Sequence, residues 1–321
     1  MGDTLRALYL VEWMVSLPHS LSSPARLVRY WCSVLEMHRY ARLLSPTSDI
    51  QRGKLLRVEN IQGDVYDPDS VILDTGHVME IRTEQLRTPV DPAIIIGTGL
   101  NYKKHAEECG LDTPEFPMLA FFKQPGAAQD PFGPIEIPAC CDPAVPEVDW
   151  EVELAVVIGK PCKDVAPEDA EDYILGYTCA NDVSARLWQT DVARTGGQWN
   201  KGKGFDTFCP LGPTMVLHDP EKFDPHALDI SLTVNDVQYQ NSNTSDFVFQ
   251  VGEVVSFLSK GTTLVPGTVI LTGTPEGIGM FQKPEPIYLN DEDVVRATIE
   301  GIGTLENHVV GAHKKYLKGE D

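Results

Sequence analysis

The sequence lacks any long hydrophobic run. No stretch of its 321 residues approaches the ~18 consecutive apolar residues of a membrane span, so we expect no membrane segment. Basic residues are also scarce, since 26 Lys and Arg stand against 47 Asp and Glu and give a formal net charge of −21. This balance excludes nucleic acid as a partner, because such surfaces need clustered Lys and Arg. A small anionic ligand stays open, because the field inside a site can oppose the net charge.

Three further absences narrow the class of protein. The seven cysteines are odd in number and lack CxxC spacing, which favours a reducing compartment over a disulfide framework. The glycine-rich stretch 196–213 lacks the G-x-x-x-x-G-K-[ST] spacing of a nucleotide P-loop. Residues 5–17 have helical apolar spacing, but no small-residue cleavage site follows, so we expect no signal peptide. We predict a cytoplasmic protein, with mitochondria as the alternative.

The segment WEVELAVVIG, residues 150–159, is the most informative one. It is rich in β-formers and ends at Gly159-Lys160-Pro161, which predicts a strand. Side chains alternate along a strand, so Glu151 and Glu153 point to the same face. Two carboxylates on a buried face repel each other, and a divalent cation with oxygen ligands would offset that repulsion. The alternative is an edge strand with both glutamates in water, where charged side chains usually lie.

A second candidate lies in GLNYKKHAEECG, which follows the apolar run AIIIGT. A short helix from Tyr102 to Cys109 would place His105 and Glu108 on one face, at i and i+3. A histidine beside a carboxylate is oriented and made more basic, which suits a general base. The alternative is a surface helix on which His105 has no role.

Two later segments carry polar groups that could join these. In NDVSARLWQ, a helix would align Asp182, Arg186 and Gln189 at i, i+4 and i+7, although Asp182 could instead only cap such a helix. TGTPEGIG, residues 272–279, follows a predicted buried strand and exposes backbone amides. Such a turn either holds an anion or simply reverses the chain.

The remaining pattern predicts an α+β protein that is mainly β. Residues 1–35 are interpreted as an N-terminal extension, partly helical, that docks on the body or on a partner chain. Short alternating runs over residues 36–90 predict a small β-rich domain with turns at Gly63, Pro68 and Gly76. Residues 91–321 form the main domain, which is β-rich, with further helices predicted at 165–173 and 250–259.

Five segments carry a family resemblance: GLNYKKHAEE, VDWEVELAVVIG, GYTCANDVSARLWQ, GKGFDTFCPLGP and LVPGTVILTGTPEGIG. Over residues 93–310 the chain resembles the fumarylacetoacetate hydrolase family, and most closely its short members that handle acylpyruvates and oxaloacetate. The resemblance implies a mixed β-sandwich-roll catalytic domain and a homodimer. It also implies Mg²⁺ or Mn²⁺, with Ca²⁺ as an alternative, and small-molecule substrates that are 2-oxo acids or 1,3-dicarbonyl compounds.

Carried over by position, the resemblance assigns the candidate residues to three groups. The metal ligands are Glu151, Glu153 and Asp182, and the water-activating dyad of a lid is His105 and Glu108. The substrate site takes Lys123, Arg186, Gln189 and Thr274, together with Lys203, which adds positive charge where an oxyanion develops. No expected catalytic position is missing, so we expect an enzyme.

The resemblance implies a metal-dependent hydrolase or decarboxylase that cleaves a C–C bond through a metal-stabilised enolate. The same site would also support keto–enol tautomerisation of oxaloacetate, in which only a proton moves. Two other hypotheses stay open at this point. One is a decarboxylase of a β-keto acid in a specialised pathway, and the other is a non-catalytic metal-binding scaffold.

Overall fold

This computed structural model describes residues 24–66, 73–141 and 147–311, and a twelve-stranded sheet is the largest element of their fold. The main path is β4-β3-β2-β1-β14-β12-β11-β17-β6-β7, with β5 beside β1 and β8 beside β14. Most neighbours are antiparallel, but β17 and β6 run in parallel, so the sheet is mixed. The strands are β1 (Arg26–Cys32), β2 (Met37–Leu43), β3 (Leu55–Gln62), β4 (Leu73–Arg82), β5 (Leu86–Arg87), β6 (Ile94–Gly99), β7 (Met118–Lys123), β8 (Ala128–Gln129), β11 (Val152–Ile158), β12 (Ile174–Asn181), β14 (Cys209–Leu217) and β17 (Thr268–Leu271).

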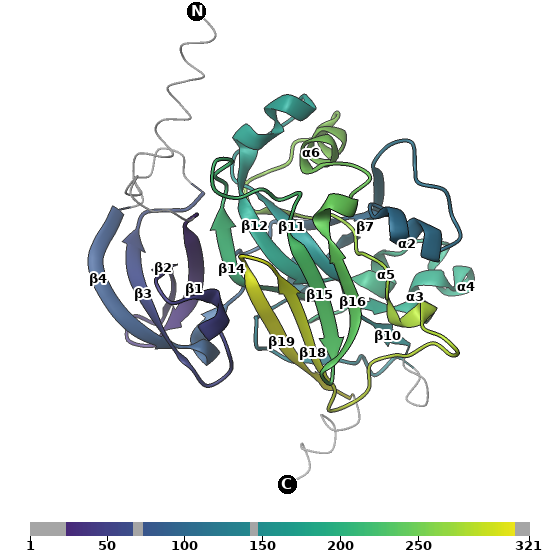
Figure 1. Cartoon of the computed structure of the whole chain (residues 1–321), viewed down its shortest axis with the longest axis horizontal. Helices are drawn as coiled ribbons and strands as arrows, with labels where there is room; N and C mark the ends of the chain where they lie inside the picture. The colour runs from purple at the N-terminus through teal and green to yellow at the C-terminus, as the bar shows by residue number, and fades with distance from the viewer. Residues whose placement is uncertain (1–23, 67–72, 142–146, 312–321) are drawn as a thin grey trace, which may run out of the picture.

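A five-stranded sheet packs in front of β11 and β12 in the view of Figure 1. In spatial order its strands are β16 (Val237–Asn243), β15 (Asp229–Val234), β18 (Val294–Ile299), β19 (Gly303–Val310) and β9 (Ile135–Glu136). Two short strands, β10 (Val148–Asp149) and β13 (Ser184–Ala185), pair separately. The α-helices are α2 (Lys103–Glu108), α3 (Arg186–Thr190), α4 (Val192–Thr195), α5 (Asn200–Lys203) and α6 (Val251–Ser259). The 3₁₀ helices are η1 (Thr47–Asp49), η2 (Thr83–Gln85), η3 (Pro125–Ala127), η4 (Pro167–Tyr173), η5 (Thr244–Asp246) and η6 (Gly279–Phe281).

Strand β11 is buried on both faces. Leu154 and Val156 belong to the core cluster shared with the five-stranded sheet, whereas Ala155 and Val157 belong to a cluster on the opposite face. A strand covered on both sides reads as a continuous apolar run rather than an alternating one, as this segment does. The predicted α+β, mainly β architecture with mixed sheets is confirmed.

The N-terminal strands extend the large sheet rather than forming one of their own. They lie at the left of Figure 1, where β1 pairs with β2 on one side and with β14 on the other. Strand structure starts at Arg26, within the segment predicted as an extension, because Arg26 pairs with Val216. The helix predicted for residues 5–17 lies outside the described residues, and the domain boundaries stay predictions.

The turn predicted at Gly76 is wrong. Gly76 lies inside β4 with a φ of +66°, and β4 pairs with β3 on both sides of it. The register shifts between Glu59 and Ile61, opposite this point, which is the signature of a β-bulge. A glycine therefore marks a bulge here, because it adopts a left-handed conformation without a steric cost.

None of the helices within these ranges combines the length and the apolar composition that crossing a bilayer requires.

Candidate active site

Glu151, Glu153 and Asp182 converge where β11 begins and β12 ends. Glu153 lies on β11, Glu151 directly precedes that strand, and Asp182 directly follows β12. The backbone N–H of Asp182 donates to the carbonyl of Glu151 (2.7 Å), which joins the two strand ends. One ligand oxygen from each of the three residues lies within 4.8 Å of the others. We call these three residues the acidic trio.

The helix predicted to align Asp182 with Arg186 and Gln189 is wrong for Asp182. Helix α3 begins only at Arg186, because residues 184–185 form β13 and pair with β10. Arg186 and Gln189 do share the helix, and Arg186 Nη1 donates to Gln189 Oε1 (3.0 Å). Asp182 reaches the site through the pairing of β11 with β12 instead.

Two buried lysines contact the acidic trio. Lys203 Nζ lies 2.8 Å from Glu151 Oε2 and 2.6 Å from Asp182 Oδ2, so it bridges two of the carboxylates. Lys123 Nζ lies 2.6 Å from Asp182 Oδ1. Lys123 also donates to the carbonyls of Val183, Lys203 and Phe208 at 3.1, 2.5 and 2.7 Å. The ammonium group of Lys123 therefore uses all its hydrogen-bond donors on Asp182 and these three carbonyls.

The carboxylates of the trio differ in their electrostatic surroundings. Burial alone would raise the pKa of Glu151, but the charges of Lys203 and Arg186 outweigh it and hold that pKa below its usual range. Burial raises the pKa of Glu153 well above its usual range, and the charges of Asp182 and Glu151 raise it further. Glu153 accepts a hydrogen bond from Gly273 N–H (2.6 Å) but forms no ion pair within the described ranges.

The electrostatic surroundings of these carboxylates suit a divalent cation. Glu153 is a buried carboxyl group beside two other carboxylates, and it lacks a compensating positive charge of its own. A cation among the three carboxylates would supply that charge. Carboxylate oxygens are also the donors that Mg²⁺, Mn²⁺ and Ca²⁺ prefer. The donor set of the trio is therefore suited to such an ion.

Asp149 is a further buried carboxylate at this site, and the sequence did not single it out. Its carboxylate, fully buried, lies 2.8 Å from both Nε and Nη2 of Arg186. The Nη1 atom of Arg186 lies 2.7 Å from Glu151 Oε1, so one guanidinium joins two carboxylates. Asp149 continues the period-two row of Glu151 and Glu153, and that spacing is the signal that could have found it.

The His105–Glu108 pair lies on α2. His105 Nδ1 is 3.0 Å from Glu108 Oε2, and Glu108 Oε1 accepts a hydrogen bond from Gly277 N–H (3.0 Å). The other ring nitrogen, Nε2, is 3.7 Å from Cys109 Sγ, a neighbour that the sequence did not single out. Burial lowers the pKa of His105, but hydrogen bonds to Cys109 and Glu108 more than compensate and raise it to about 9.

The loop 272–281 holds several of these carboxylates through its backbone. Gly273 N–H donates to Glu153, Gly277 N–H to Glu108, and the N–H groups of Gly279 and Met280 to Asp149. The sequence left open whether this turn holds an anion or only reverses the chain. Its amides bind the protein's own carboxylates.

Gly277 must be a glycine. Its φ is +100°, and a Cβ there would lie 2.0 Å from the carbonyl oxygen of Tyr239. The same part of the chain holds Thr274, whose hydroxyl donates to the carbonyl of Val152 (2.9 Å) and accepts from Gln240 Nε2 (2.8 Å).

A cavity of about 210 Å³ brings these groups together. The acidic trio contributes Glu151 and Glu153 to its wall, and the dyad contributes His105. The remaining lining residues are Thr98, Gly99, Leu100, Cys109, Leu111, Phe121, Arg186, Gln189, Thr190, Trp199, Lys203, Gly273, Thr274, Ile278, Met280 and Phe281. Seven of the ten predicted site residues line the cavity, while Glu108, Lys123 and Asp182 are not part of its lining.

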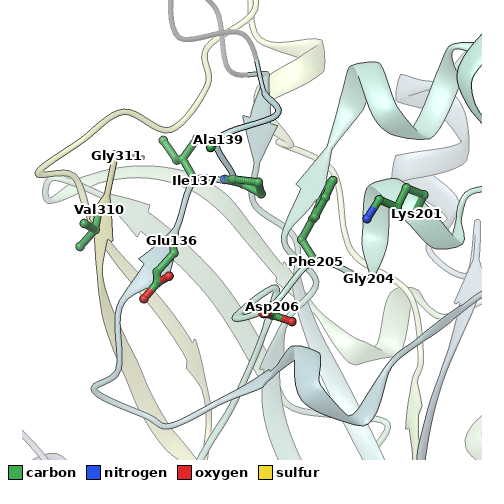
Figure 2. A pocket seen from close by; sticks show the side chains of 10 residues that line it. Glu136, Ile137, Ala139, Lys201, Gly204, Phe205, Asp206, Val310 and Gly311 are labelled. Carbon is green, nitrogen blue, oxygen red and sulfur yellow. The ribbon is translucent and has the colours of Figure 1, made fainter. Parts of the chain in front are cut away.

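A second hollow, of about 540 Å³, lies elsewhere on the surface (Figure 2). Lys201 and Phe205 form one side of it, and Glu136 and Val310 form the other. None of the ten predicted site residues lines it. Helix α5 contributes Lys203 to the first cavity and Lys201 to the second, so it touches both.

A comparison with known protein families gives a match over most of the chain. The family described as fumarylacetoacetate (FAA) hydrolase C-terminal matches residues 94–310, which is more than half of the chain. The chain belongs to the fumarylacetoacetate hydrolase family. Known members of this family are enzymes, among them hydrolases, isomerases and tautomerases.

Individual relatives carry different names. A Dictyostelium discoideum protein, fumarylacetoacetate hydrolase domain-containing protein 2 homolog, is 45% identical over 232 residues, covering 70% of this chain and 74% of the relative. A Xenopus laevis protein, oxaloacetate tautomerase fahd2, mitochondrial, is 45% identical over 242 residues, covering 75% of this chain and 73% of the relative.

Solved structures of the family share the fold. The 2-hydroxyhepta-2,4-diene-1,7-dioate isomerase from Mycobacterium marinum is 36% identical with a TM-score of 0.71, and the match covers 90% of this chain and 99% of that one. The 5-carboxymethyl-2-hydroxymuconate delta-isomerase from Mycobacterium smegmatis is 37% identical with a TM-score of 0.70, covering 89% and 99%.

Proposed function

We propose that this chain is a divalent-metal-dependent enzyme that acts on a 2-oxo acid through its enol or enolate form. The observation that carries this proposal is a single cavity with Glu151 and Glu153 on its wall together with the His105 imidazole. Enolisation needs positive charge at an oxygen and a group that moves a proton at the neighbouring carbon. The two glutamates on the cavity wall would help to hold the cation that supplies the positive charge, and His105 would move the proton.

Each residue has a role in this proposal. The acidic trio would hold Mg²⁺ or Mn²⁺, with Ca²⁺ as the alternative, and the ion supplies Lewis-acid charge. Arg186 and Lys203 place further positive charge at the same wall, where a carboxylate or an oxyanion would lie. Lys123 would hold Asp182 in place through the ion pair between their side chains.

Keto–enol tautomerisation is the reaction that we favour. The Xenopus relative is named for this reaction on oxaloacetate, and the two Mycobacterium structures are named as isomerases. These reactions move a proton and need no attacking water. His105 would take the proton from the substrate carbon or return it, while Glu108 holds the imidazole in place through Nδ1.

Cleavage of a C–C bond is the second candidate. The observation in its favour is the His105–Glu108 pair, because a carboxylate-oriented imidazole is suited to take a proton from water. In hydrolysis that water would attack the distal carbonyl of an acylpyruvate. In decarboxylation of oxaloacetate or of a specialised β-keto acid, CO₂ would leave without any water attack.

The test follows both substrates in one set of samples. Oxaloacetate enriched in its enol form should relax to the keto form faster with the protein, and EDTA should abolish the acceleration. Acetylpyruvate cleavage and CO₂ release are measured beside it. Acceleration that persists with EDTA would contradict the metal-dependent proposal, and no turnover in any assay would favour the non-catalytic scaffold.

Two other expectations stay predictions. A homodimer can be checked by light scattering of the purified chain. The cytoplasmic location and its mitochondrial alternative can be separated by cell fractionation, and the Xenopus relative carries the word mitochondrial in its name.

A further inference from the structure

Asp149 is a buried carboxylate to which neither the family resemblance nor the comparisons assign a role. Its Oδ1 accepts hydrogen bonds from Trp150 N–H (2.8 Å) and Gly279 N–H (2.7 Å). Its Oδ2 accepts from Met280 N–H (2.9 Å) and faces Arg186 Nε and Nη2, both at 2.8 Å. The residue is fully buried and does not line the cavity. Any effect on the reaction must therefore pass through the groups that it holds.

The group that matters most is Arg186. Its guanidinium is shared, because Nη1 lies 2.7 Å from Glu151 Oε1 while Nε and Nη2 face Asp149. The other oxygen of Glu151 is 2.8 Å from Lys203 Nζ. Both oxygens of this carboxylate therefore already contact a cation. A metal ion at the acidic trio has to compete with Arg186 for Oε1.

We propose that Asp149 is a positioning residue that draws the positive charge of Arg186 away from Glu151 and so keeps Glu151 available to a divalent cation. The proposal rests on the proposed function, because it takes the acidic trio as the metal site. Without the negative charge at Asp149, the guanidinium is attracted by Glu151 alone. Arg186 then becomes a stronger competitor of the metal, although no ligand of that metal has changed.

The same contacts also bind Asp149 to the loop of Gly279 and Met280, so a purely structural role is the competing explanation. The two explanations differ in one respect. If Asp149 acts through Arg186, removing the charge of Arg186 must restore metal binding. If Asp149 only holds the loop, a second substitution at Arg186 adds to the damage.

The experiment measures Mn²⁺ affinity by calorimetry and by electron paramagnetic resonance of free Mn²⁺, with no substrate present. Asp149→Asn keeps the size of the side chain and the Oδ1 acceptor. We expect it to weaken Mn²⁺ binding about 10–100-fold, the usual effect of losing a partner that supports a metal ligand. We expect Asp149→Asn/Arg186→Gln to return close to the wild-type affinity. Asp164→Asn, which changes a carboxylate bonded to Gly261 N–H in another loop, is the matched control and should leave the affinity unchanged.

Each outcome has one meaning. Wild-type protein that is folded and binds no Mn²⁺ overturns both the proposed function and this inference. Wild-type binding that Asp149→Asn does not weaken, or a loss that Arg186→Gln does not rescue, overturns only the inference. If the single variant fails to fold, the double variant still decides, because it removes both partners of the Asp149–Arg186 ion pair while Glu151 keeps its contact with Lys203. Near-wild-type affinity of the double variant supports the proposal, and weak binding contradicts it.

Discussion

The acidic trio and the His105–Glu108 dyad belong to one site, but they are held in different ways. The trio lies at the ends of two central strands, and two of its members, Glu151 and Asp182, contact Lys123, Lys203 and Arg186 in the buried interior. The dyad lies on α2, a helix of six residues. Within the described residues, one backbone N–H, that of Gly277, ties Glu108 to the loop beside it. The trio is therefore part of the core, whereas the dyad is attached to it.

This difference separates two kinds of mutational effect. A substitution in the trio that breaks a buried ion pair should alter both stability and metal binding. A substitution in the dyad leaves the core intact, so it should alter the reaction and spare metal binding.

The largest effect is expected at Asp182. Asp182→Ala leaves the ammonium groups of Lys123 and Lys203 buried without a shared carboxylate. Breaking a buried ion pair by removing one partner typically costs about 3–5 kcal/mol, so we expect a loss of that order in the free energy of unfolding. Divalent-cation binding should be lost as well. Urea unfolding of the metal-free protein and calorimetry measure the two effects, and unchanged Mg²⁺ affinity would remove Asp182 from the metal site.

Glu153→Gln is the matched contrast within the trio. Glu153 forms no ion pair among the described residues, so the neutral amide should leave the metal-free protein about as stable as the wild type. Metal affinity should still fall, by more than the ~10–100-fold that a supporting residue costs. Stability lost to the same extent as in Asp182→Ala would contradict the difference drawn between the two carboxylates.

The dyad should show the opposite pattern. His105→Ala removes the group that moves the proton, and the loss of a general base or acid typically lowers kcat by about 10²–10⁴-fold. Mg²⁺ affinity should stay near that of the wild type, because within the described residues no hydrogen bond or ion pair joins His105 to the trio carboxylates. Steady-state kinetics and calorimetry on the same preparation check both statements. Tautomerisation and acylpyruvate hydrolysis should suffer strongly, and decarboxylation less, since it needs no activated water.

Much of this site could be predicted from the sequence because its geometry is local. Period-two alternation put Glu151 and Glu153 on one face, and the i, i+3 spacing put His105 beside Glu108. Both are contacts within one element, and the structure has both. The fold class could also be predicted, because short runs rich in β-formers recur along the chain.

Contacts between distant segments could not be predicted in the same way. Asp149 is held by Gly279 and Met280, which lie about 130 positions further along the chain. Lys123 was expected in the substrate site, but its ammonium is buried among carbonyl groups beneath Asp182. Local spacing carries no information on such tertiary contacts. The family resemblance pointed to Lys123 by position but not to the direction of its side chain.

A smaller effect is expected in the pH dependence of stability. The pKa of His105 is raised to about 9 from its ordinary value of 6.5. The protonated ring therefore stabilises the metal-free fold, fully below about pH 6.5, and this contribution is lost as the pH rises through about 9. Glu108→Gln removes one of the partners that raise the pKa, so the fall in unfolding free energy over this range should become shallower. Nuclear magnetic resonance titration of the His105 ring measures the pKa directly, and an unchanged value would leave Cys109 and the charge of Glu151 as the causes.

The smallest effect concerns motion of the segment that follows the dyad. Helix α2 has buried His105 and Ala106, whereas residues 112–117 form no regular secondary structure, and Leu111 and Phe116 are 55% and 60% exposed. Few buried contacts predict low protection from hydrogen exchange. We expect amides of residues 112–117 to exchange faster than those of β11 and to gain protection with Mg²⁺ and oxalate, a planar chelate that resembles an enolpyruvate.

Because Gly277 N–H already holds Glu108 without a ligand, α2 itself should gain less protection than the segment that follows it. Exchange monitored by mass spectrometry resolves the two. Equal gains across residues 102–117 would instead support a wider lid that includes the dyad. Gains confined to residues 112–117 would show that the dyad is preformed, so that the ligand orders only the segment beside it. A preformed dyad would also account for an effect of His105→Ala on kcat without an effect on metal affinity.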